Sequence, residues 1–360
     1  MVEAIAREAE LRKDFFAGLD GRSSIEIENH SPTSIALDTL YFGGGTPSLL
    51  EASDWDLLTE RLWNSFDFVP DPEFTVECNP DDLSPERLAV LHAAGVNRLS
   101  IGVQSFRDQD LTLMNRSHNA GQASRSIEDA RKAGFANITA DLIYGIPGLS
   151  LKAWEENIRR MIDLGVDHIS AYALTVEERT ALYHQVEKGT VDLPNDQTFH
   201  EHYYLLIELL GSAEFEHYEL SNFARPGFRS RHNSSYWEGE PYLGLGPSAH
   251  SYCHPKRAWN VSNNAKYLKL VEAGKLPEEA SEELSVQDQI NEYLMTHLRK
   301  TEGIDLERLQ GMGHDLRRIS TQEIASYEKE GLLIDEGNRI RLTPSGLMLS
   351  NEIISEFFLA

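Results

Sequence analysis

Polar and charged side chains follow one apolar segment after another in the first half of the chain, beginning with the glycine run of Leu40-Tyr-Phe-Gly-Gly-Gly-Thr-Pro47. The candidate residues are the glycines Gly44 and Gly45 of that run and the polar or charged residues Thr46, Glu77, Gln104, Arg116 and Asp141. Glycines at the end of a strand let main-chain N–H and C=O groups approach a polar small molecule directly. Two carboxylates, a guanidinium and an amide suit a zwitterionic amino acid joined to a ribose. S-adenosylmethionine has those parts.

A second group of candidate ligands lies in the segment Arg231-His-Asn-Ser-Ser-Tyr-Trp237. His232 and Tyr236 are four residues apart, so one helical turn would place the imidazole and the phenol on the same side. Both side chains can be axial ligands of haem iron. Cations that could meet haem propionates are Arg225, Arg229, Arg231, Lys256 and Arg257. Aromatic side chains that could meet the flat ring are Phe223, Phe228, Tyr236, Trp237 and Tyr242.

Taken alone, a His-x3-Tyr segment is more simply explained as a structural loop with a hydrogen-bonded histidine. His217, His250 and His254 are alternative ligands for haem iron. Cys253 is a weaker candidate, since a free cysteine is by default a buried, inert thiol.

Strands and helices alternate up to about residue 222, which predicts repeated βα architecture with the polar strand ends at one face. The expected strands are 38–42, 74–77, 98–103, 138–143, 168–174 and 217–220. Expected helices include 84–94, with Ser84 as N-cap, and 151–164 after the cap Ser150. An amphipathic helix is predicted over 4–16 with no strand before it, so a leading unit is expected to be missing.

The rest of the chain changes in character. Residues 223–275 are loop-like and rich in aromatic residues, Gly, Asn and Pro, and helical periodicity resumes over 286–299. The tail predicts helices over 305–309 and 320–330 and a hairpin over 332–342, an arrangement typical of a winged helix. Residues 284–360 hold 8 basic and 13 acidic side chains, whereas a DNA reader needs a cationic face.

Composition narrows the classes of partner. The chain has 360 residues and a formal net charge of -25, which disfavours nucleic acid and anionic membrane surfaces. No apolar run is long enough to span a membrane and no secretory leader opens the chain, so a cytoplasmic location is expected. Its two cysteines, Cys78 and Cys253, are too few for a disulfide framework and are not spaced as metal ligands.

Five motifs carry a resemblance over nearly the whole chain: FGGGTP, ECNP, GVQSF, DLIYGIPG and GLGPSAH. Together they resemble the radical S-adenosylmethionine (SAM) proteins related to oxygen-independent coproporphyrinogen III oxidase, and within that group the haem chaperone (HemW) branch. The resemblance implies an α/β fold: an incomplete (βα)6 barrel, here lacking its first strand, and a smaller C-terminal α+β winged-helix-like domain. It implies a barrel core over 1–222, a loop-rich haem- or substrate-binding segment over 223–283 and a C-terminal domain over 284–360.

The resemblance also implies function. Gly44, Gly45, Thr46, Glu77, Gln104, Arg116 and Asp141 would bind SAM. His232 and Tyr236 match a haem-binding motif of the HemW branch, so the chain would bind haem and pass it to acceptor proteins, with respiratory-chain or membrane-associated proteins as candidates. The alternatives are a coproporphyrinogen III oxidase and a scaffold without a cluster, so whether the chain is an enzyme stays open.

The chain departs from the family at its start. Family members carry Cys-x3-Cys-x2-Cys just after the first strand, where three thiolates hold a [4Fe-4S] cluster to which SAM binds. Neither Cys78 nor Cys253 can replace that triplet, so a mis-called start or a fragment is the favoured explanation, and no catalytic or cluster-ligating residue is assigned.

We therefore expect this chain, as given, to bind no cluster after anaerobic reconstitution with iron and sulfide, because it lacks three thiolates in one place. Iron analysis of the desalted protein measures this directly. About four irons per chain would contradict the expectation.

Overall fold

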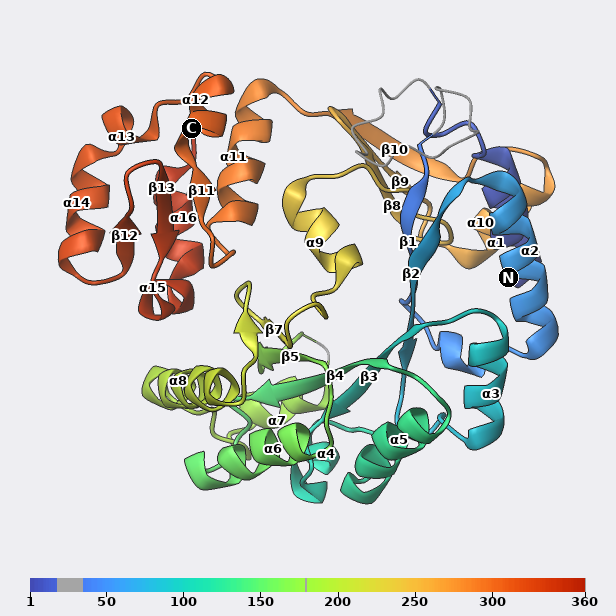
Figure 1. The fold of residues 1–360 in the computed structure, drawn as a ribbon, viewed down its shortest axis with the longest axis horizontal. Coiled ribbons are helices and arrows are strands. Elements are labelled where there is room, and N and C mark those ends of the chain that lie inside the picture. The colour runs from blue at the N-terminus through green and yellow to red at the C-terminus, as the bar shows by residue number, and fades with distance from the viewer. Residues whose placement is uncertain (18–34, 179, 360) are drawn as a thin grey trace.

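A computed structural model describes residues 1–17, 35–178 and 180–359 of the chain (Figure 1). Its main sheet has the strand order β1-β2-β3-β4-β5-β7-β6. The first five strands are parallel neighbours in chain order. They are β1 (Leu37–Phe42), β2 (Phe68–Cys78), β3 (Arg98–Gln104), β4 (Asn137–Tyr144) and β5 (His168–Ala173). The predicted incomplete βα barrel is thus confirmed.

The sheet ends in two short strands that run the other way. β7 (Asn222–Ala224) pairs antiparallel with β5, and β6 (Glu216–His217) pairs antiparallel with β7. The single strand expected over 217–220 was therefore wrong in its bounds, because the chain turns between these two short strands. Residues 219–222 lie at this turn and line a cavity.

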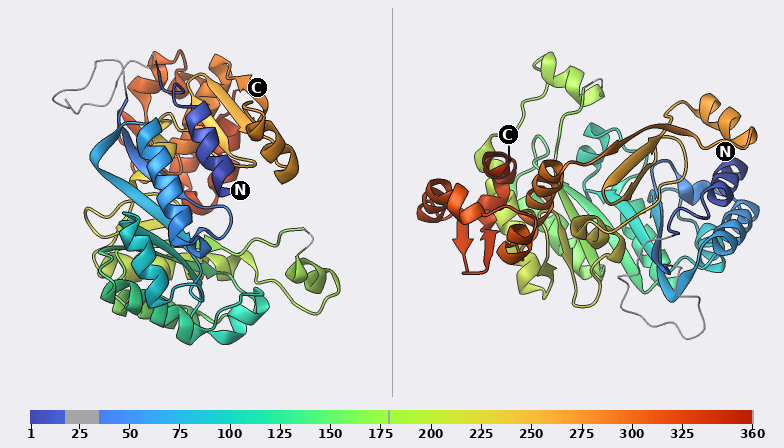
Figure 2. Two further views of the ribbon diagram at one scale, coloured as in Figure 1. Left: turned by 90° about the vertical axis from the view of Figure 1, so that its right-hand side faces the viewer. Right: turned by 90° about the horizontal axis from the view of Figure 1, so that it is seen from above.

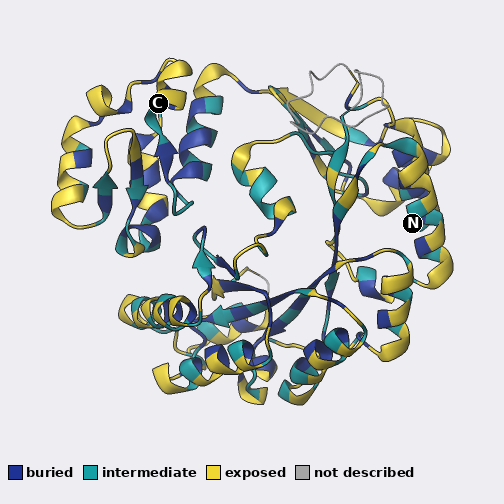
Figure 3. Cartoon of the chain, in the orientation of Figure 1, coloured by how far each residue is buried: buried dark blue, intermediate teal, exposed yellow. Residues whose placement is uncertain are grey.

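Helices cover the outside of the sheet, with their outer faces exposed and the strands between them largely buried (Figures 1 and 3). They are α2 (Ala52–Ser65), α3 (Pro85–Ala93), α4 (Asp108–Leu113), α5 (Ala120–Lys132), α6 (Leu151–Asp163) and α8 (Asp196–Ser212). Ser84 and Ser150 cap α3 and α6 through their side chains, as predicted. A short 3-10 helix, η1 (Pro47–Leu49), follows the glycine run. α7 (Ala181–Glu187) stands away from the barrel (Figure 2).

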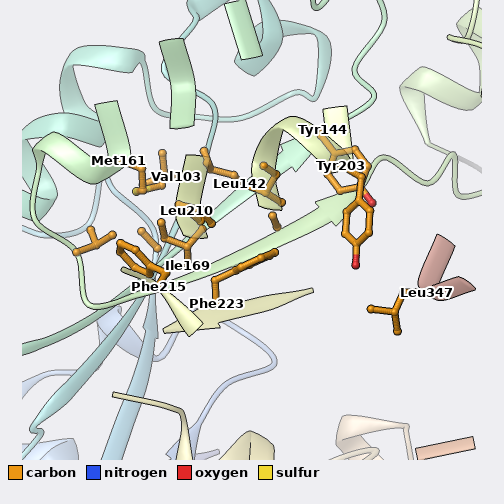
Figure 4. Packing of buried hydrophobic residues seen from close by; sticks show 14 of the residues in the cluster. Val103, Leu142, Tyr144, Met161, Ile169, Tyr203, Leu210, Phe215, Phe223 and Leu347 are labelled. Carbon is orange, nitrogen blue, oxygen red and sulfur yellow. The ribbon is translucent and has the colours of Figure 1, made fainter. Parts of the chain in front are cut away.

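The barrel core lies between the sheet and these helices. Apolar side chains of β3, β4 and β5, among them Val103, Leu142 and Ile169, pack against Met161 of α6 and Leu210 of α8 (Figure 4). All five are at most 2% exposed. Burial of the apolar strand faces fixes which side chains point inward, and so fixes the polar groups that alternate with them.

The first helix is shorter than predicted. α1 spans Val2–Leu11 instead of 4–16, and it packs beside α2. Its fully buried Glu8 accepts hydrogen bonds from Tyr267 Oη at 2.6 Å and from the backbone N–H of Gly246 at 2.8 Å. Glu8 also pairs with Arg12. These bonds tie α1 to the segment after the barrel.

The segment predicted as loop-like holds regular structure, so that prediction was wrong. It contains α9 (Arg231–Glu238), α10 (Asn264–Glu272) and a three-stranded sheet of β8 (His250–Cys253), β9 (Lys256–Asn260) and β10 (Glu278–Glu283). The sequence of β10 is EEASEE, which has no apolar alternation to reveal a strand. Arg257 of β9 lies opposite Glu282 of β10, with their charged groups 3.5 Å apart. An ion pair between the two strands therefore accompanies their antiparallel pairing.

The C-terminal domain is winged-helix-like, as predicted. Its three-stranded sheet has the order β11-β13-β12. Its strands are β11 (Ile304–Asp305), β12 (Leu333–Asp335) and β13 (Arg339–Leu342). Its helices are α11 (Val286–His297), α12 (Leu306–Gly311), α13 (Leu316–Ile319), α14 (Thr321–Lys329), α15 (Pro344–Met348) and α16 (Ser350–Phe357). α9 stands between this domain and the first two barrel strands (Figure 1).

Candidate functional site

The two predicted carboxylates come together inside the barrel. Glu77 of β2 and Asp141 of β4 both line a small cavity of about 80 Å³, together with Tyr41 of β1 and Ser170 of β5. Parallel pairing sets this arrangement, because Asp141 lies opposite Ser170 in the register of β4 and β5. The alternation of inward and outward side chains along each strand then points both carboxylates to the same interior.

The glycine run lies against Glu77. The backbone N–H of Gly44 donates to Glu77 Oε2 at 3.2 Å. A Cβ atom at Gly43 would lie 2.7 Å from the Glu77 carboxyl group, whereas one at Gly44 or Gly45 would meet nothing within 4 Å. Gly44 also has φ +85°, which favours glycine. The run therefore presents open backbone beside a carboxylate, and Thr46 stands at the N-cap position of the short helix η1 that follows, without a capping hydrogen bond from its side chain.

The other two predicted residues, Gln104 and Arg116, do not line this cavity. Gln104 ends β3, is buried, and has φ 65°, an uncommon backbone conformation for a residue other than glycine. Arg116 is exposed just after α4. Its positive charge nonetheless lowers the pKa of Asp141, so it lies within electrostatic reach of the carboxylates.

Asp141 is the carboxylate whose environment is most unusual. Burial raises its pKa to about 7, and the negative charge of Glu77 adds to that shift. The hydroxyl of Ser170 and the charge of Arg116 act in the opposite direction. A carboxylic acid that titrates near neutral pH in a polar cavity is typical of a functional site.

The second predicted pair also comes together. α9 begins at Arg231, so His232 and Tyr236 lie on one helical turn, and His232 Nε2 is 3.2 Å from Tyr236 Oη. His232 Nδ1 lies 2.8 Å from the hydroxyl of Thr39 in β1. Burial lowers the pKa of His232 to about 4, which keeps the imidazole neutral at neutral pH. A neutral imidazole is the form that binds metals.

The two candidate sites touch each other, which the sequence did not predict. The Tyr41 ring stacks on the His232 ring with centroids 4.7 Å apart and planes at 15°. The Tyr41 hydroxyl donates to Glu77 Oε1 at 2.7 Å. Tyr41 therefore has its hydroxyl group in one site and its ring face in the other.

A buried carboxylate of β2 holds the start of α9. Glu73 accepts hydrogen bonds from the backbone N–H groups of Arg231 and His232, both at 3.0 Å. Arg98 of β3 lies 3.5 Å from Glu73 and donates to the backbone carbonyl of Phe228 at 3.3 Å. A negative charge at a helix N-terminus is favourable, so this pair fixes the helix that carries His232. Sequence reasoning missed both residues.

The expected patch of free cations around the haem motif was wrong. Arg229 pairs with Glu216 and Glu302, and Arg257 pairs with Glu282 and Glu292. The other three each have a contact of their own: Lys256 with Glu278, Arg231 with the backbone oxygen of Asp71, and Arg225 over the Phe215 ring. Acidic partners elsewhere in the sequence thus pair with three of the five cations, whereas among the described residues the side chains of Arg225 and Arg231 have only uncharged partners.

The predicted aromatic side chains divide into two groups. Tyr236 and Tyr242 meet edge to face at 4.7 Å, and Trp237 lines a cavity beside them. Phe223 is in the core, where His217 stacks on it, and Phe228 is half-buried.

The alternative ligands lie elsewhere. His250 stacks on Trp259, and His254 lies 3.3 Å from the Tyr252 hydroxyl. Cys253 ends β8.

Within the described residues no three His, Cys, Asp or Glu side chains are grouped so that they could hold a metal ion. Cys78 is buried at the end of β2, and burial raises the pKa of its thiol, which disfavours the thiolate that metals bind. The residues described thus do not fit a [4Fe-4S] cluster, and no step is assigned to one.

Comparison with known proteins places these features in a family. Residues 26–161 match the Radical SAM superfamily and residues 284–349 match the HemN C-terminal domain. "Heme chaperone HemW" of Bacillus subtilis is 36% identical over 326 residues, covering 89% of this chain and 85% of that protein. The protein of the same name from Lactococcus lactis is 35% identical, covering 93% and 86%.

A relative from Bos taurus, "Radical S-adenosyl methionine domain-containing protein 1, mitochondrial", is 31% identical and covers 88% of this chain and 75% of that protein. Among solved structures, the radical SAM enzyme coproporphyrinogen III oxidase (HemN) from Escherichia coli matches with a TM-score of 0.79. That match covers 99% of this chain and 82% of the oxidase at 24% identity, and it shows the fold alone.

The raised pKa of Asp141 predicts a pH-dependent effect of Asp141→Asn on stability. The folded protein holds this proton up to about pH 7, whereas the unfolded chain releases it near pH 4. Wild type should therefore lose stability relative to the variant as pH rises through that window, by at most about 1.4 kcal/mol per unit. Urea unfolding at several pH values measures the difference.

Asp192→Asn is the matched control, because Asp192 is exposed. A difference between Asp141→Asn and wild type that stays constant from pH 4 to pH 8 would show that Asp141 titrates normally.

Proposed function

Because the chain belongs to the radical SAM superfamily and, within it, to the family of the haem chaperone HemW, we propose that it binds haem and transfers it to acceptor proteins. The relatives that carry this name cover most of the chain. The predicted family is thereby confirmed; haem binding and transfer are the proposal.

The observation that carries the proposal is the His232–Tyr236 pair on α9. Its imidazole is neutral and has a polar partner at each nitrogen, Thr39 at Nδ1 and Tyr236 at Nε2. Metal-binding histidines commonly donate their second ring N–H to a nearby acceptor, which fixes the tautomer. If Nδ1–H donates to the Thr39 hydroxyl, the Nε2 lone pair faces Tyr236. Iron would then replace the hydrogen bond from the Tyr236 hydroxyl at Nε2.

We propose further that the barrel edge binds SAM through the residues predicted from the sequence. Their fit rests on the open backbone of Gly44 and Gly45 beside Glu77, and on Asp141 in the adjoining cavity. Open N–H and C=O groups suit the amino acid part, and the two carboxylates suit the sugar hydroxyls and the positive charges of the ligand. Thr46, Gln104 and Arg116 complete the proposed set.

The partners follow from the same proposal. Acceptors would be apo-proteins that bind haem, with respiratory-chain or membrane-associated proteins as candidates. Within the described residues, no helix combines the length and apolarity needed to cross a bilayer. The net charge of -25 favours protein partners over nucleic acid, and we propose a cytoplasmic location.

A haem titration followed at the Soret band tests the ligand assignment. Wild type should show saturable binding, and His232→Ala should weaken it because an axial ligand is lost. Thr39→Val should weaken binding by a smaller amount, about tenfold, because it removes only the group that orients the imidazole.

His184→Ala serves as the control, since His184 is an exposed histidine on α7, away from this site. An unchanged titration curve for His232→Ala would remove the basis for the assignment.

A further inference from the structure

A cavity of about 600 Å³ lies between the barrel, α9 and the C-terminal domain. Its walls come from five segments of the chain, of which the sequence predicted only the aromatic side chains Tyr236 and Trp237 of α9. The walls are formed by Tyr172 near the end of β5, residues 219–222 from the turn after β6 to the first residue of β7, one face of α9, and Thr296, Arg299 and Asn351 from two segments of the C-terminal domain. Its volume is in the range of sites for small molecules, roughly 300–1,000 Å³.

The helix that carries the proposed haem ligand forms one wall. Asn233, Tyr236 and Trp237 line the cavity, and their spacing of three and four residues puts them on one face of α9. The hydroxyl of Tyr236 also lies 3.2 Å from His232 Nε2. The His232–Tyr236 pair thus stands at the edge of this cavity.

Aromatic side chains are unusually exposed here. Tyr172 from the barrel is 45% exposed and Tyr236 from α9 is 43% exposed. Large aromatic rings normally bury most of their surface, and rings that line a cavity offer flat apolar faces to a flat ligand. With Trp237 they give the cavity the character expected of a site for a large planar ring.

Arg299 supplies a positive charge to the same cavity. Its guanidinium donates to the neutral side chain of Asn351 at 2.7 Å, and among the described residues it makes no direct ion pair, although the negative charge of Glu219 acts on it. Its neighbours Lys300 and Arg308 differ, since both pair with Glu238. Burial lowers the pKa of Arg299. A partly buried guanidinium with a neutral partner can bind a carboxylate of a ligand.

We propose that this cavity binds the haem ring and that Arg299 binds a propionate of it; this inference rests on the proposed function. The ring would lie between the aromatic side chains of the barrel and of α9, with one face toward α9 so that His232 could reach the iron at the centre of the ring. The propionate would take the side of the guanidinium that Asn351 leaves free.

One acidic side chain shares the cavity and must be compatible with an anionic ligand. Glu219 is buried, and it accepts a hydrogen bond from the backbone N–H of Ser221 at 3.3 Å. Burial raises the pKa of Glu219 to about 7, so about half of it is uncharged at neutral pH. Its remaining negative charge acts on Arg299 and offsets the charge of the guanidinium only in part.

The test compares haem with haem dimethyl ester, which keeps the ring and the iron but has no propionate charge, in the same dilute detergent. Wild type should bind haem about tenfold or more tightly than the ester, as expected for one charged hydrogen-bonded pair. Arg299→Gln should lose this preference through weaker haem binding while its affinity for the ester stays the same. Arg341→Gln, which removes a half-buried arginine of the same domain that pairs with Glu336, should behave as wild type.

Asn351→Asp gives a second route to the same result. It places a carboxylate beside the intact guanidinium, so it should abolish the preference for haem over the ester without removing Arg299. If Arg299→Gln does not fold, Asn351→Asp still tests the inference.

Two results would overturn the inference. If both variants keep the wild-type preference for haem while His232→Ala still weakens binding, Arg299 does not bind a propionate and the proposed function stands. If wild type binds neither haem nor the ester, the proposed function fails and this inference fails with it.

Discussion

The arrangement of both candidate sites depends on one buried ion pair, Glu73 with Arg98. Both side chains are at most 4% exposed, in neighbouring strands of the barrel. Glu73 accepts the first backbone N–H groups of α9, and Arg98 donates to the carbonyl of Phe228 in the loop before it. An isolated helix of eight residues would not be stable in water. Because breaking a buried pair on one side costs about 3–5 kcal/mol, this pair can hold α9 against the barrel.

Fixing α9 there brings the two sites into contact. Glu77, which we propose binds SAM, accepts from the Tyr41 hydroxyl, and the Tyr41 ring stacks on His232. A ligand that takes Glu77 from Tyr41 would change the packing of His232, and by linkage a ligand on His232 would affect binding at Glu77 to the same degree. The other end of α9 meets the C-terminal domain, where Glu238 pairs with Lys300. α9 is thus the element that connects all parts of the site.

Predictions from the sequence were correct for features that depend on a local pattern of residues. They failed for features that depend on contacts between residues far apart in the sequence. The parallel strands, the caps Ser84 and Ser150, and the spacing of His232 and Tyr236 all follow from periodicity, and the structure has them. The role of Glu73 could not be predicted from the sequence, because the backbone amides that it binds lie 158 and 159 positions away. The same distance effect hid the acidic partners of Arg229 and Arg257. The cavity at Arg299 was hidden because five separate segments of the chain form it.

Hydrogen–deuterium exchange of Glu73→Gln tests most directly whether this pair holds α9. The account predicts that the amides of α9 exchange about 100-fold faster or more than in wild type, a larger increase than for those of β3 and β4. The double variant Glu73→Gln/Arg98→Met removes the unpaired charge that the single change leaves buried, and it should restore barrel stability without restoring protection of α9. Unchanged exchange of α9 in Glu73→Gln would contradict the account.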